Sequence, residues 1–581
     1  MFDAVRLALV SNRFEGIVRA MMNTLLRTAR SAILNTARDF SCCILTAEDE
    51  MLAMAESIPV HVMGGPDLMA AWMKRLHPVL RRGDAFLHNS PYHGNSHAAD
   101  WCVLIPVIDD EGAHRYTVVA KAHLADCGNA IPTTYYADAR DVYQEGALIF
   151  PCVKVQENYE TNDDVIRMAR LRIRVPDLWY GDFLALLGAA RIGERRLIEL
   201  IDELGADALN HYQRDWFDYS ERRMSTAIGR LPGGTVTREM RHDPFPGMPE
   251  GIPLKVIVTV DPAEPRVDVD LTDNLDCQPC GLNLTEATAR SAGRMGVFTG
   301  LGEVVPLNAG SFRRVRVHLR ENCVVGIPRH PVSCSVATTD LSELIGSAVS
   351  AAIAELGEGY GTAEFGRAQP PSMGVISGLD ARDGQPFVNQ LMLATTNGAG
   401  APHADGWLTI LGVGAAGFLL HDSVEIDEMK YPIRIDAQRI LQDSEGAGRF
   451  RGAPGAYVEY GPVAGELEVV YLSDGTFTPT RGVRGGHGGA PARQLRRGAD
   501  GELSDELGCY AHVVLGPGET IVSMTCGGGG YGPPEEREPE RVAKDVREGW
   551  VTRERALEIY AVALDSDDAV ESEETARLRD G

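Results

Sequence analysis

The N-terminal part of the chain is organised around the stretch GDAFLHNSPYHGNSHAAD, which spans Gly83–Asp100. An apolar run, Trp101–Ile108, follows it, and a short polar turn separates this run from a second one, Tyr116–Ala122. Two apolar runs joined by a polar turn predict two antiparallel strands. The hairpin therefore returns the chain to its starting end, where His123-Leu124-Ala125-Asp126 follows the second strand.

The two ends of this hairpin carry the same pattern, a histidine followed three positions later by an aspartate. His97-x-x-Asp100 precedes the first strand, and His123-x-x-Asp126 follows the second. An antiparallel hairpin brings both motifs to one edge, and imidazole and carboxylate groups are common ligands of Zn²⁺ and of harder divalent ions. The spacing therefore indicates a metal site. The alternative is a polar loop rim whose histidines bind nothing.

The chain is long and acidic, with 581 residues, 44% hydrophobic content and a formal net charge of −26 at pH 7. This length and apolar content predict a large core divided among several domains. The negative charge argues against a nucleic-acid partner, which requires a basic face. The eleven cysteines have no framework spacing, the start has no signal-peptide pattern, and no apolar run is long enough to cross a bilayer. These features predict a cytoplasmic protein with no membrane association.

Three regions differ in their patterns, and together they predict a mixed α/β (α+β), multidomain fold. Residues 1–235 are interpreted as an α/β domain that carries the metal-site hairpin, and residues 236–430 as a mixed α/β domain. Residues 431–581 are rich in short strands separated by glycines. This last region is expected to end in helices and a mobile acidic tail.

Within the first region, apolar positions that recur every four residues predict a helix over Phe14–Arg38, which leads directly into Asp39. Asp39 therefore lies at a helix-to-strand corner, where its carboxylate either points out of the scaffold or only caps a turn. Ile58–Val62 is interpreted as a strand in which His61 packs rather than binds. Further helices are expected at residues 68–76, 182–204, 206–230, 283–301, 340–356 and 539–547, and a strand pair at 254–260 and 266–271.

Several familiar motifs are absent or weak. The chain has neither the GxxxxGK[ST] loop that holds nucleotide phosphates nor the GxSxG elbow of many serine hydrolases. Gly527–Gly530 is interpreted as architectural because no lysine accompanies it. Cys277-x-x-Cys280 is interpreted as incidental because it has no second pair. The small-residue loop Thr395–Asp405 either brings backbone close to a ligand or forms a surface turn.

The chain resembles the hydantoinase B/oxoprolinase family, which includes B-type subunits of ATP-dependent hydantoinases and caprolactamase and α-type subunits of acetone and acetophenone carboxylases. The resemblance runs nearly end to end and keeps the family order. The matching segments are ARDFSCCIL, GDAFLHNSPYHGNSHAAD, HLADCGNAIP, VPLNAGSFRRVRV, TTNGAGAPHADGW, GAGRFRGAPG, RGVRGGHGG and CGGGGYGPPEEREPERVAKDV.

The resemblance implies a metal site and a partner. Family members that bind metal use a carboxylate after the first long helix and histidines of the two hairpin motifs, positions that fall here on Asp39, His97 and His123, with Asp100 as a further ligand. Asp126 is expected either to orient the ligand imidazoles or to act as a base near the metal, which is expected to be Mn or Zn. ATP and Mg are expected on a separate A-type, actin-like ATPase subunit, so the protein is expected to be a hetero-oligomer.

Two positions depart from the family pattern. The common form has Asn-Asp-Pro where this chain has Asn89-Ser90-Pro91, and many members have His-His-x-Asp where this chain has His123-Leu124-Ala125-Asp126. One carboxylate and one imidazole of the common pattern are therefore missing.

Three functions are compatible with this resemblance. The first is an ATP-dependent hydrolase of a cyclic amide, such as a hydantoin, a lactam or an oxoproline-like ring. The partner would phosphorylate the amide oxygen, and a metal-activated water would attack the carbon. The second is an ATP-dependent ketone carboxylase, for which this chain is short. The third is a non-catalytic scaffold for the ATPase subunit.

Overall fold

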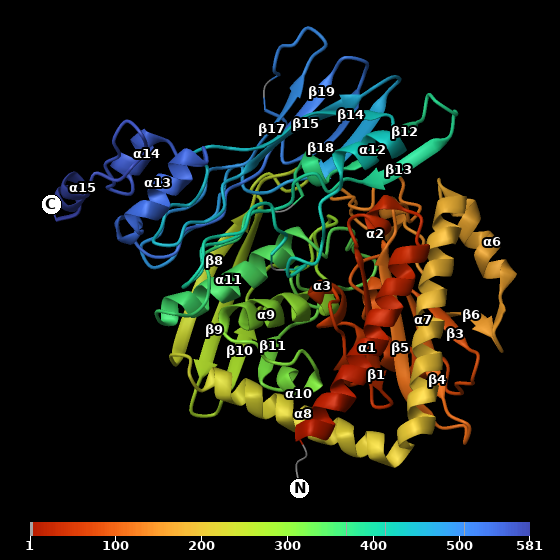
Figure 1. Ribbon diagram of the computed structural model, residues 1–581. Helices are drawn as coiled ribbons and strands as arrows, with labels where there is room; N and C mark the ends of the chain where they lie inside the picture. The colour runs from red at the N-terminus through yellow and green to blue at the C-terminus, as the bar shows by residue number, and fades with distance from the viewer. Residues whose placement is uncertain (1–3, 368, 413, 505, 581) are drawn as a thin grey trace.

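The computed structural model describes residues 4–367, 369–412, 414–504 and 506–580 (Figure 1). The described chain contains one seven-stranded sheet and three four-stranded sheets, with helices packed between and around them. The mixed α/β, multidomain fold class predicted from the sequence is confirmed. The division at residues 235 and 430 stays a prediction.

The N-terminal sheet is antiparallel and has the strand order β2-β1-β5-β4-β3-β6-β7. Alternate residues of one strand enter different cores: Cys42 and Ile44 of β1 pack with the helices α1 and α7, whereas Cys43 and Leu45 pack with α4 on the opposite face. Both faces of the sheet are therefore covered by helices, which explains why its central strands are continuous apolar runs in the sequence. The strands are β1 (Phe40–Thr46), β2 (Met51–Ala53), β3 (Ala85–His88), β4 (Asp100–Ile108), β5 (His114–His123), β6 (Val153–Glu157) and β7 (Glu160–Thr161).

Long helices cover this sheet, and Figure 1 shows α1 and α7 side by side along it. The helix predicted over Phe14–Arg38 is interrupted, because Asp182 Oδ1 accepts the backbone N–H groups of Arg30 at 2.6 Å and Ser31 at 3.2 Å. The helices of the region are α1 (Ala4–Thr28), α2 (Ala32–Asn35), α3 (Pro59–Val62), α4 (Pro66–Leu76), η1 (Pro91–His93), α5 (Val142–Glu145), α6 (Asp163–Arg172), α7 (Pro176–Leu204) and α8 (Ala206–Ile228).

The prediction of a strand over Ile58–Val62 is wrong, because residues 59–62 form the short helix α3. Pro59 occupies the first helical position, where its missing N–H and fixed φ are tolerated. The N-cap residue of the next helix, α4, is Gly65, and Asp67 lies in its first turn.

The central region forms a second sheet, of order β11-β10-β9-β8, against which α9 and α11 pack. Buried and half-buried residues alternate along β9, so that one face of the strand meets the helices. The predicted strand pair and the helix at residues 340–356 are confirmed. The elements are β8 (Gly234–His242), β9 (Ile252–Asp261), β10 (Arg266–Asp270), α9 (Glu286–Gly300), α10 (Ala309–Phe312), β11 (Val315–His318) and α11 (Asp340–Leu356).

Two further sheets lie at the top of Figure 1, with the orders β13-β12-β16-β18 and β14-β15-β19-β17. Residues from both, including Val469 of β16 and Val458 of β15, share one buried cluster, so the two sheets pack on each other. The elements are η2 (Pro371–Met373), β12 (Val375–Leu379), β13 (Pro386–Gln390), α12 (Val424–Lys430), β14 (Ile433–Ile440), β15 (Ala456–Pro462), β16 (Leu467–Leu472), β17 (Arg493–Arg497), β18 (Tyr510–Leu515) and β19 (Thr520–Met524).

The glycine-rich segments assemble around Gly527–Gly530. Successive N–H groups of this run donate to different neighbouring segments, and two of these segments accept again from the residue three positions later. The bonds run from Gly527 to Ala490 O, from Gly530 to His487 O, from Gly528 to Ala453 O and from Tyr531 to Phe450 O, at 2.8–3.0 Å.

A repeat of three residues per turn is the geometry of the polyproline II helix, which has no internal hydrogen bonds and here finds its partners in neighbouring segments. A Cβ atom added at Gly528 would lie 2.0 Å from Gly398 O, so only glycine allows this approach. The architectural interpretation of the glycine run is therefore confirmed. The Thr395–Asp405 loop joins the same bundle through the bond from Gly400 N to Gly529 O, 2.8 Å long.

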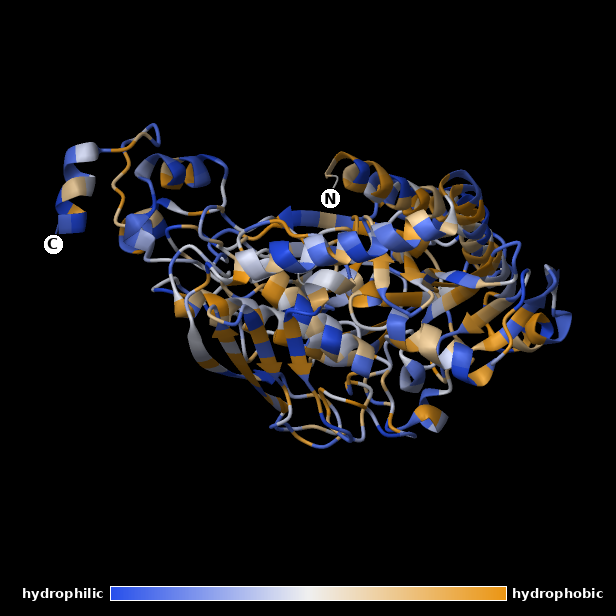
Figure 2. Cartoon of the chain, turned by 90° about the horizontal axis from the view of Figure 1, so that it is seen from below, coloured by the Kyte–Doolittle hydropathy of each residue, from blue (hydrophilic) through white to orange (hydrophobic). Residues whose placement is uncertain are grey.

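The C-terminal helices lie at one end of the molecule, away from the N-terminal helices (Figures 1 and 2). The acidic tail, expected to be mobile, instead contains α15, whose Arg579 donates to Arg537 O at 2.7 Å and Tyr560 O at 3.1 Å. The described helices mix hydrophilic and hydrophobic residues along their length (Figure 2), and none of them is long and apolar enough to cross a membrane. The elements are η3 (Pro534–Glu536), α13 (Pro539–Arg547), α14 (Arg553–Glu558) and α15 (Ser572–Asp580).

Candidate metal centre

The β4–β5 hairpin positions two of the candidate ligands. Asp100 is the first residue of β4, His123 is the last of β5, and the two residues face each other across the antiparallel ladder. The hairpin predicted from the sequence is therefore confirmed, together with the proximity of its two ends. His97 lies three residues before β4, in a turn closed by the bond from Asp100 N to His97 O.

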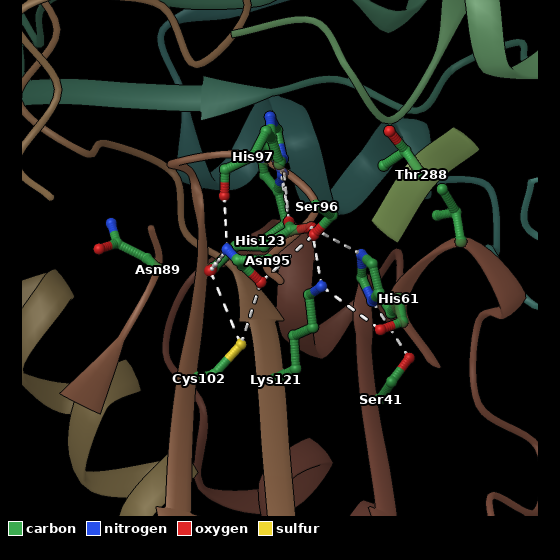
Figure 3. Close-up of polar contacts among 12 residues, drawn as sticks. Ser41, His61, Asn89, Asn95, Ser96, His97, Cys102, Lys121, His123 and Thr288 are labelled. Atoms are coloured by element: carbon green, nitrogen blue, oxygen red, sulfur yellow. Dashed lines mark hydrogen bonds and ion pairs between the residues drawn. The ribbon is translucent and has the colours of Figure 1, made fainter. Parts of the chain in front are cut away.

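Three side-chain atoms converge at this end of the hairpin (Figure 3). His97 Nε2 lies 3.0 Å from Asp100 Oδ1 and 3.1 Å from His123 Nδ1, and His123 Nδ1 lies 3.3 Å from Asp100 Oδ1. Each of the three residues is buried. Ligands of a tetrahedral Zn²⁺ at about 2.0–2.1 Å from the ion are separated by about 3.3 Å, close to the edges of this triangle.

The hydrogen bonds of the two imidazoles fix which nitrogens face the centre of the triangle. His97 Nδ1 lies 2.8 Å from Ser335 O, so it carries the proton and leaves a lone pair on Nε2. His123 Nε2 lies 3.0 Å from Thr134 Oγ1, which can accept its proton and leave a lone pair on Nδ1. With these tautomers, two lone pairs and a carboxylate oxygen meet at one point, an arrangement that suits a divalent metal. Without a metal, a proton on His97 Nε2, which the raised pKa of His97 beside Asp100 favours, occupies the same contact with Asp100 Oδ1.

The second oxygen of Asp100 is held by the Lys121 ammonium group and by polar side chains. Oδ2 accepts a hydrogen bond from Ser96 and lies 3.3 Å from His61 Nε2 and 3.7 Å from Lys121 Nζ. Burial would raise the pKa of Asp100, but His97, His61 and Lys121 hold it well below its ordinary value. Asp100 is therefore an anion in the resting site.

Asp39 lies beside the triangle but does not enter it. Its carbonyl oxygen accepts from His123 N at 3.0 Å, because Asp39 directly precedes β1, which pairs with β5. Its carboxylate Oδ1 lies 3.6 Å from His61 Nε2. Burial and the neighbouring Asp100 raise the pKa of Asp39 to about 8. The structure thus brings together His97, Asp100 and His123, with the Asp39 carboxylate next to them.

The sequence interpretation missed His61 and Lys121. His61 Nδ1 lies 3.1 Å from Ser41 Oγ, and its Nε2 lies between the carboxylates of Asp39 and Asp100. A histidine in an apolar run gave no sign of this contact. Lys121 did carry a signal, since it is a lysine within an apolar strand, and its Nζ donates to His61 O at 3.4 Å.

Asp126 faces another part of the chain. Its Oδ2 accepts from Arg174 N at 2.6 Å, and its Oδ1 accepts from Arg174 Nη1 and from Gly128 N, both at 3.0 Å. The carboxylate is 1% exposed, and it is not part of the three-residue group. Its role as a base stays a prediction.

Neither departure from the family pattern removes a residue of the triangle. Ser90 Oγ lies 2.7 Å from His93 Nδ1, outside the converging atoms. Leu124 is 1% exposed and packs in the apolar core of the N-terminal sheet. Cys277 and Cys280 are likewise outside the group that could hold a metal among the described residues.

A small cavity adjoins the triangle. It is lined on one side by Asp39, His61 and His123, and its volume of about 20 Å³ has room for one water molecule. The Tyr135 ring, which also lines it, stacks on His123 with ring centroids 5.2 Å apart. More distant parts of the chain complete the wall with Thr338, Gln369, Met373, Gln390, Met392 and Leu411.

A buried His/Asp/His group on a mixed α/β scaffold defines the class of site, and comparison with known proteins defines the family. The family model for hydantoinase B/oxoprolinase matches residues 3–534. The chain therefore belongs to the hydantoinase B/oxoprolinase family.

Three relatives illustrate this likeness. The caprolactamase subunit beta of Pseudomonas jessenii is 30% identical over 97% of this chain and 96% of its own length. The crystal structure of the ATP-dependent caprolactamase from the same organism covers 100% of both chains with a TM-score of 0.86 and 27% identity. The nucleotide-free structure of an acetone carboxylase covers 100% of this chain and 82% of its own with a TM-score of 0.88; at 16% identity it shows the fold alone.

Proposed function

We propose that this chain is the metal-binding subunit of an ATP-dependent hydrolase that opens a cyclic amide such as a hydantoin, a lactam or an oxoproline-like ring. The observation that carries the proposal is the convergence of His97 Nε2, His123 Nδ1 and Asp100 Oδ1 within 3.0–3.3 Å of one another. The relative named caprolactamase subunit beta supports the choice of a cyclic amide.

His97, Asp100 and His123 would hold the metal, for which we propose Zn or Mn, and Asp39 would complete the set. A divalent metal in this position supplies Lewis-acid chemistry that makes water more acidic near neutral pH. The adjoining cavity, which Asp39 and His123 line, has room for that water. We further propose that Asp126 accepts a proton during turnover, after its bonds to Arg174 loosen.

The activating step belongs to a partner in this proposal. The chain carries no GxxxxGK[ST] loop, whereas the related caprolactamase of known structure is an ATP-dependent enzyme. We propose that an A-type, actin-like ATPase subunit binds ATP and Mg and phosphorylates the amide oxygen. Phosphorylation would make the amide carbon more electrophilic, so that water can attack it. We place the complex in the cytoplasm, supported by eleven free cysteines.

The proposal is tested by assaying the purified chain with its ATPase partner, ATP and Mg. Near-stoichiometric Mn or Zn and ring opening of a hydantoin or lactam are expected. The alternative, a ketone carboxylase that shares this fold, predicts instead ATP-dependent carboxylation of acetone or acetophenone. A metal-free chain that only stabilises the ATPase would be a scaffold, and that result would overturn the hydrolase proposal.

A further inference from the structure

A surface pocket of about 450 Å³ lies where the Thr395–Asp405 loop meets the C-terminal helix α13. None of its described lining residues lines the cavity beside the metal centre, so the two sites are separate. Most of the lining is cationic or aromatic, and these residues are Trp407, Arg451, Arg537, Arg541, Lys544 and Trp550.

Ion pairs between arginines and aspartates form the floor of this pocket. Arg537 is buried, and it donates to Asp405 Oδ1 at 2.7 Å and to Asp545 Oδ2 at 2.8 Å. Arg451 donates to both oxygens of Asp545 at 3.1 Å, and Arg541 donates to Asp405 Oδ2 at 2.6 Å. Each planar guanidinium group is therefore fixed in place, which gives the pocket a rigid floor.

The pocket has an excess of positive charge. Four cationic side chains line it but only two carboxylates, those of Asp405 and Asp545, which leaves a formal excess of two positive charges. The Lys544 side chain is 65% exposed and lies 3.7 Å from Glu548, a surface pair that stabilises little by itself. The whole chain carries a net charge of −26. A positive pocket on such an acidic protein attracts anionic groups locally.

Trp407 presents its indole to solvent from a backbone that is held in place. Its side chain belongs to a residue that is 73% exposed, whereas Gly398 N donates to its carbonyl oxygen at 2.9 Å. The preceding residue, Gly406, donates to Arg451 O at 2.8 Å. A large apolar side chain held in this way loses little freedom on binding. Tryptophan and arginine are also the residues that contribute most to binding at protein interfaces.

We infer that this pocket docks an acidic segment of the ATPase partner; this inference rests on the proposed function, which supplies that partner. A carboxylate of the segment pairs with Arg541 and Lys544, and a neighbouring apolar side chain packs on the Trp407 indole. Because the indole is mostly exposed, it forms a rim that a second protein can cover. The helix α13 lies with α14 and α15 at one end of the molecule (Figure 1), where a partner can approach it.

The test is to measure binding of the purified full-length chain to the ATPase subunit by biolayer interferometry at low and high salt. Trp407→Ala is expected to weaken binding by about 30-fold, the loss typical of an interface residue of this kind. Lys544→Glu is expected to slow association by about tenfold at low salt, because it reverses a charge that attracts the partner. This second effect should shrink at high salt, where exposed charges are screened.

Two matched variants outside the pocket are the controls. Phe477→Ala removes an aromatic side chain that is 68% exposed. Arg195→Glu reverses a charge that is 63% exposed and lies 3.9 Å from Glu199, one helical turn away, as Lys544 does from Glu548. Both controls should bind the ATPase subunit as the wild type does. All four variants should keep the circular dichroism spectrum and the metal content of the wild type.

Unchanged binding by both Trp407→Ala and Lys544→Glu would overturn the inference, and the proposed function would stand if the complex still opened lactams. Self-association of the chain that is lost in Trp407→Ala, with ATPase binding unchanged, would also overturn it and would assign the pocket to a contact between copies. A wild-type chain that does not bind the ATPase subunit would overturn the proposed function as well.

Discussion

Asp100 and His123 face each other as cross-strand partners at the open end of the β4–β5 hairpin, with Asp100 Oδ1 3.3 Å from His123 Nδ1. This register has a chemical consequence, because a shift by one residue would turn either side chain to the opposite face of the sheet. The apolar strands that fix the register are buried on both faces. The hydrophobic core of the N-terminal sheet therefore holds the geometry of the candidate metal centre.

Replacement of a triangle histidine should remove the metal. His97→Ala and His123→Ala each delete one of the three converging atoms. Metal content is therefore expected to fall from near one ion per chain to about a tenth or less. Even the loss of a group that only hydrogen-bonds to a metal ligand weakens metal binding by a comparable factor. Metal analysis by mass spectrometry measures this effect, and circular dichroism checks the fold. His403→Ala, which alters an exposed histidine, is the control and should keep its metal. Metal retained in both triangle variants would contradict the site.

Asp126→Asn tests the predicted base separately from the metal. If Asp126 accepts a proton during turnover, kcat should fall by about 10²–10⁴-fold while the metal content stays unchanged. Arg174→Met removes a side-chain bond to the same carboxylate and should change kcat without changing the metal content. An unchanged kcat in Asp126→Asn would contradict the role of Asp126 as a base. Its carboxylate would then serve only to hold the segment around Arg174.

The glycine bundle should not tolerate a methyl group. Gly528→Ala places a Cβ 2.0 Å from Gly398 O, and the surrounding backbone has little room to move. We expect the free energy of unfolding to fall by at least about 2 kcal/mol, as in other overpacked interiors. Thermal unfolding measures this change.

Gly188→Ala is the matched control for the glycine bundle. Gly188 lies within α7, and a Cβ added there meets no atom within 4 Å. Alanine is favoured over glycine in a helix, so this variant should be as stable as the wild type or more stable by up to about 1 kcal/mol. Similar losses in both variants would show that the bundle is not specifically intolerant of side chains.

A buried histidine outside the metal centre should make stability depend on pH. His242 Nε2 lies 3.2 Å from Asp340 Oδ1, and its Nδ1 lies 2.8 Å from Asp243 O. Burial would lower its pKa, but Asp474 and Asp340 raise it from 6.5 to about 9. Burial, opposed by His242, raises the pKa of Asp474 to about 6.

The folded pKa of His242 lies above the unfolded one, so its contribution to stability is complete below pH 6.5 and is lost as the pH rises through about 9. The loss amounts to about 3 kcal/mol for a shift of this size. Urea unfolding at pH 6.5 and pH 9 should therefore show a decrease in the wild type that is smaller in His242→Gln. Identical pH profiles of the two proteins would refute this assignment.

The sequence by itself determined the hairpin and three of the residues at its end. The strands could be recognised because apolar runs and a polar turn are local signals, and antiparallel pairing then places His97, Asp100 and His123 together. The helix at 340–356 could also be read, since an apolar segment of that length bounded by glycine is a local pattern. The helix–strand corner at Asp39 was located in the same way, but the direction of its carboxylate was not.

The tertiary structure alone decided what surrounds those residues. His61 reaches the site from a short helix, and Gln369 and Gln390 come from segments that lie far beyond the hairpin along the chain. The glycine run finds its hydrogen-bond partners in segments that are also distant in sequence. Periodicity reports which face of an element is buried, but not which distant element covers it. That choice depends on the packing of the whole chain, and here it places the cavity beside the metal centre.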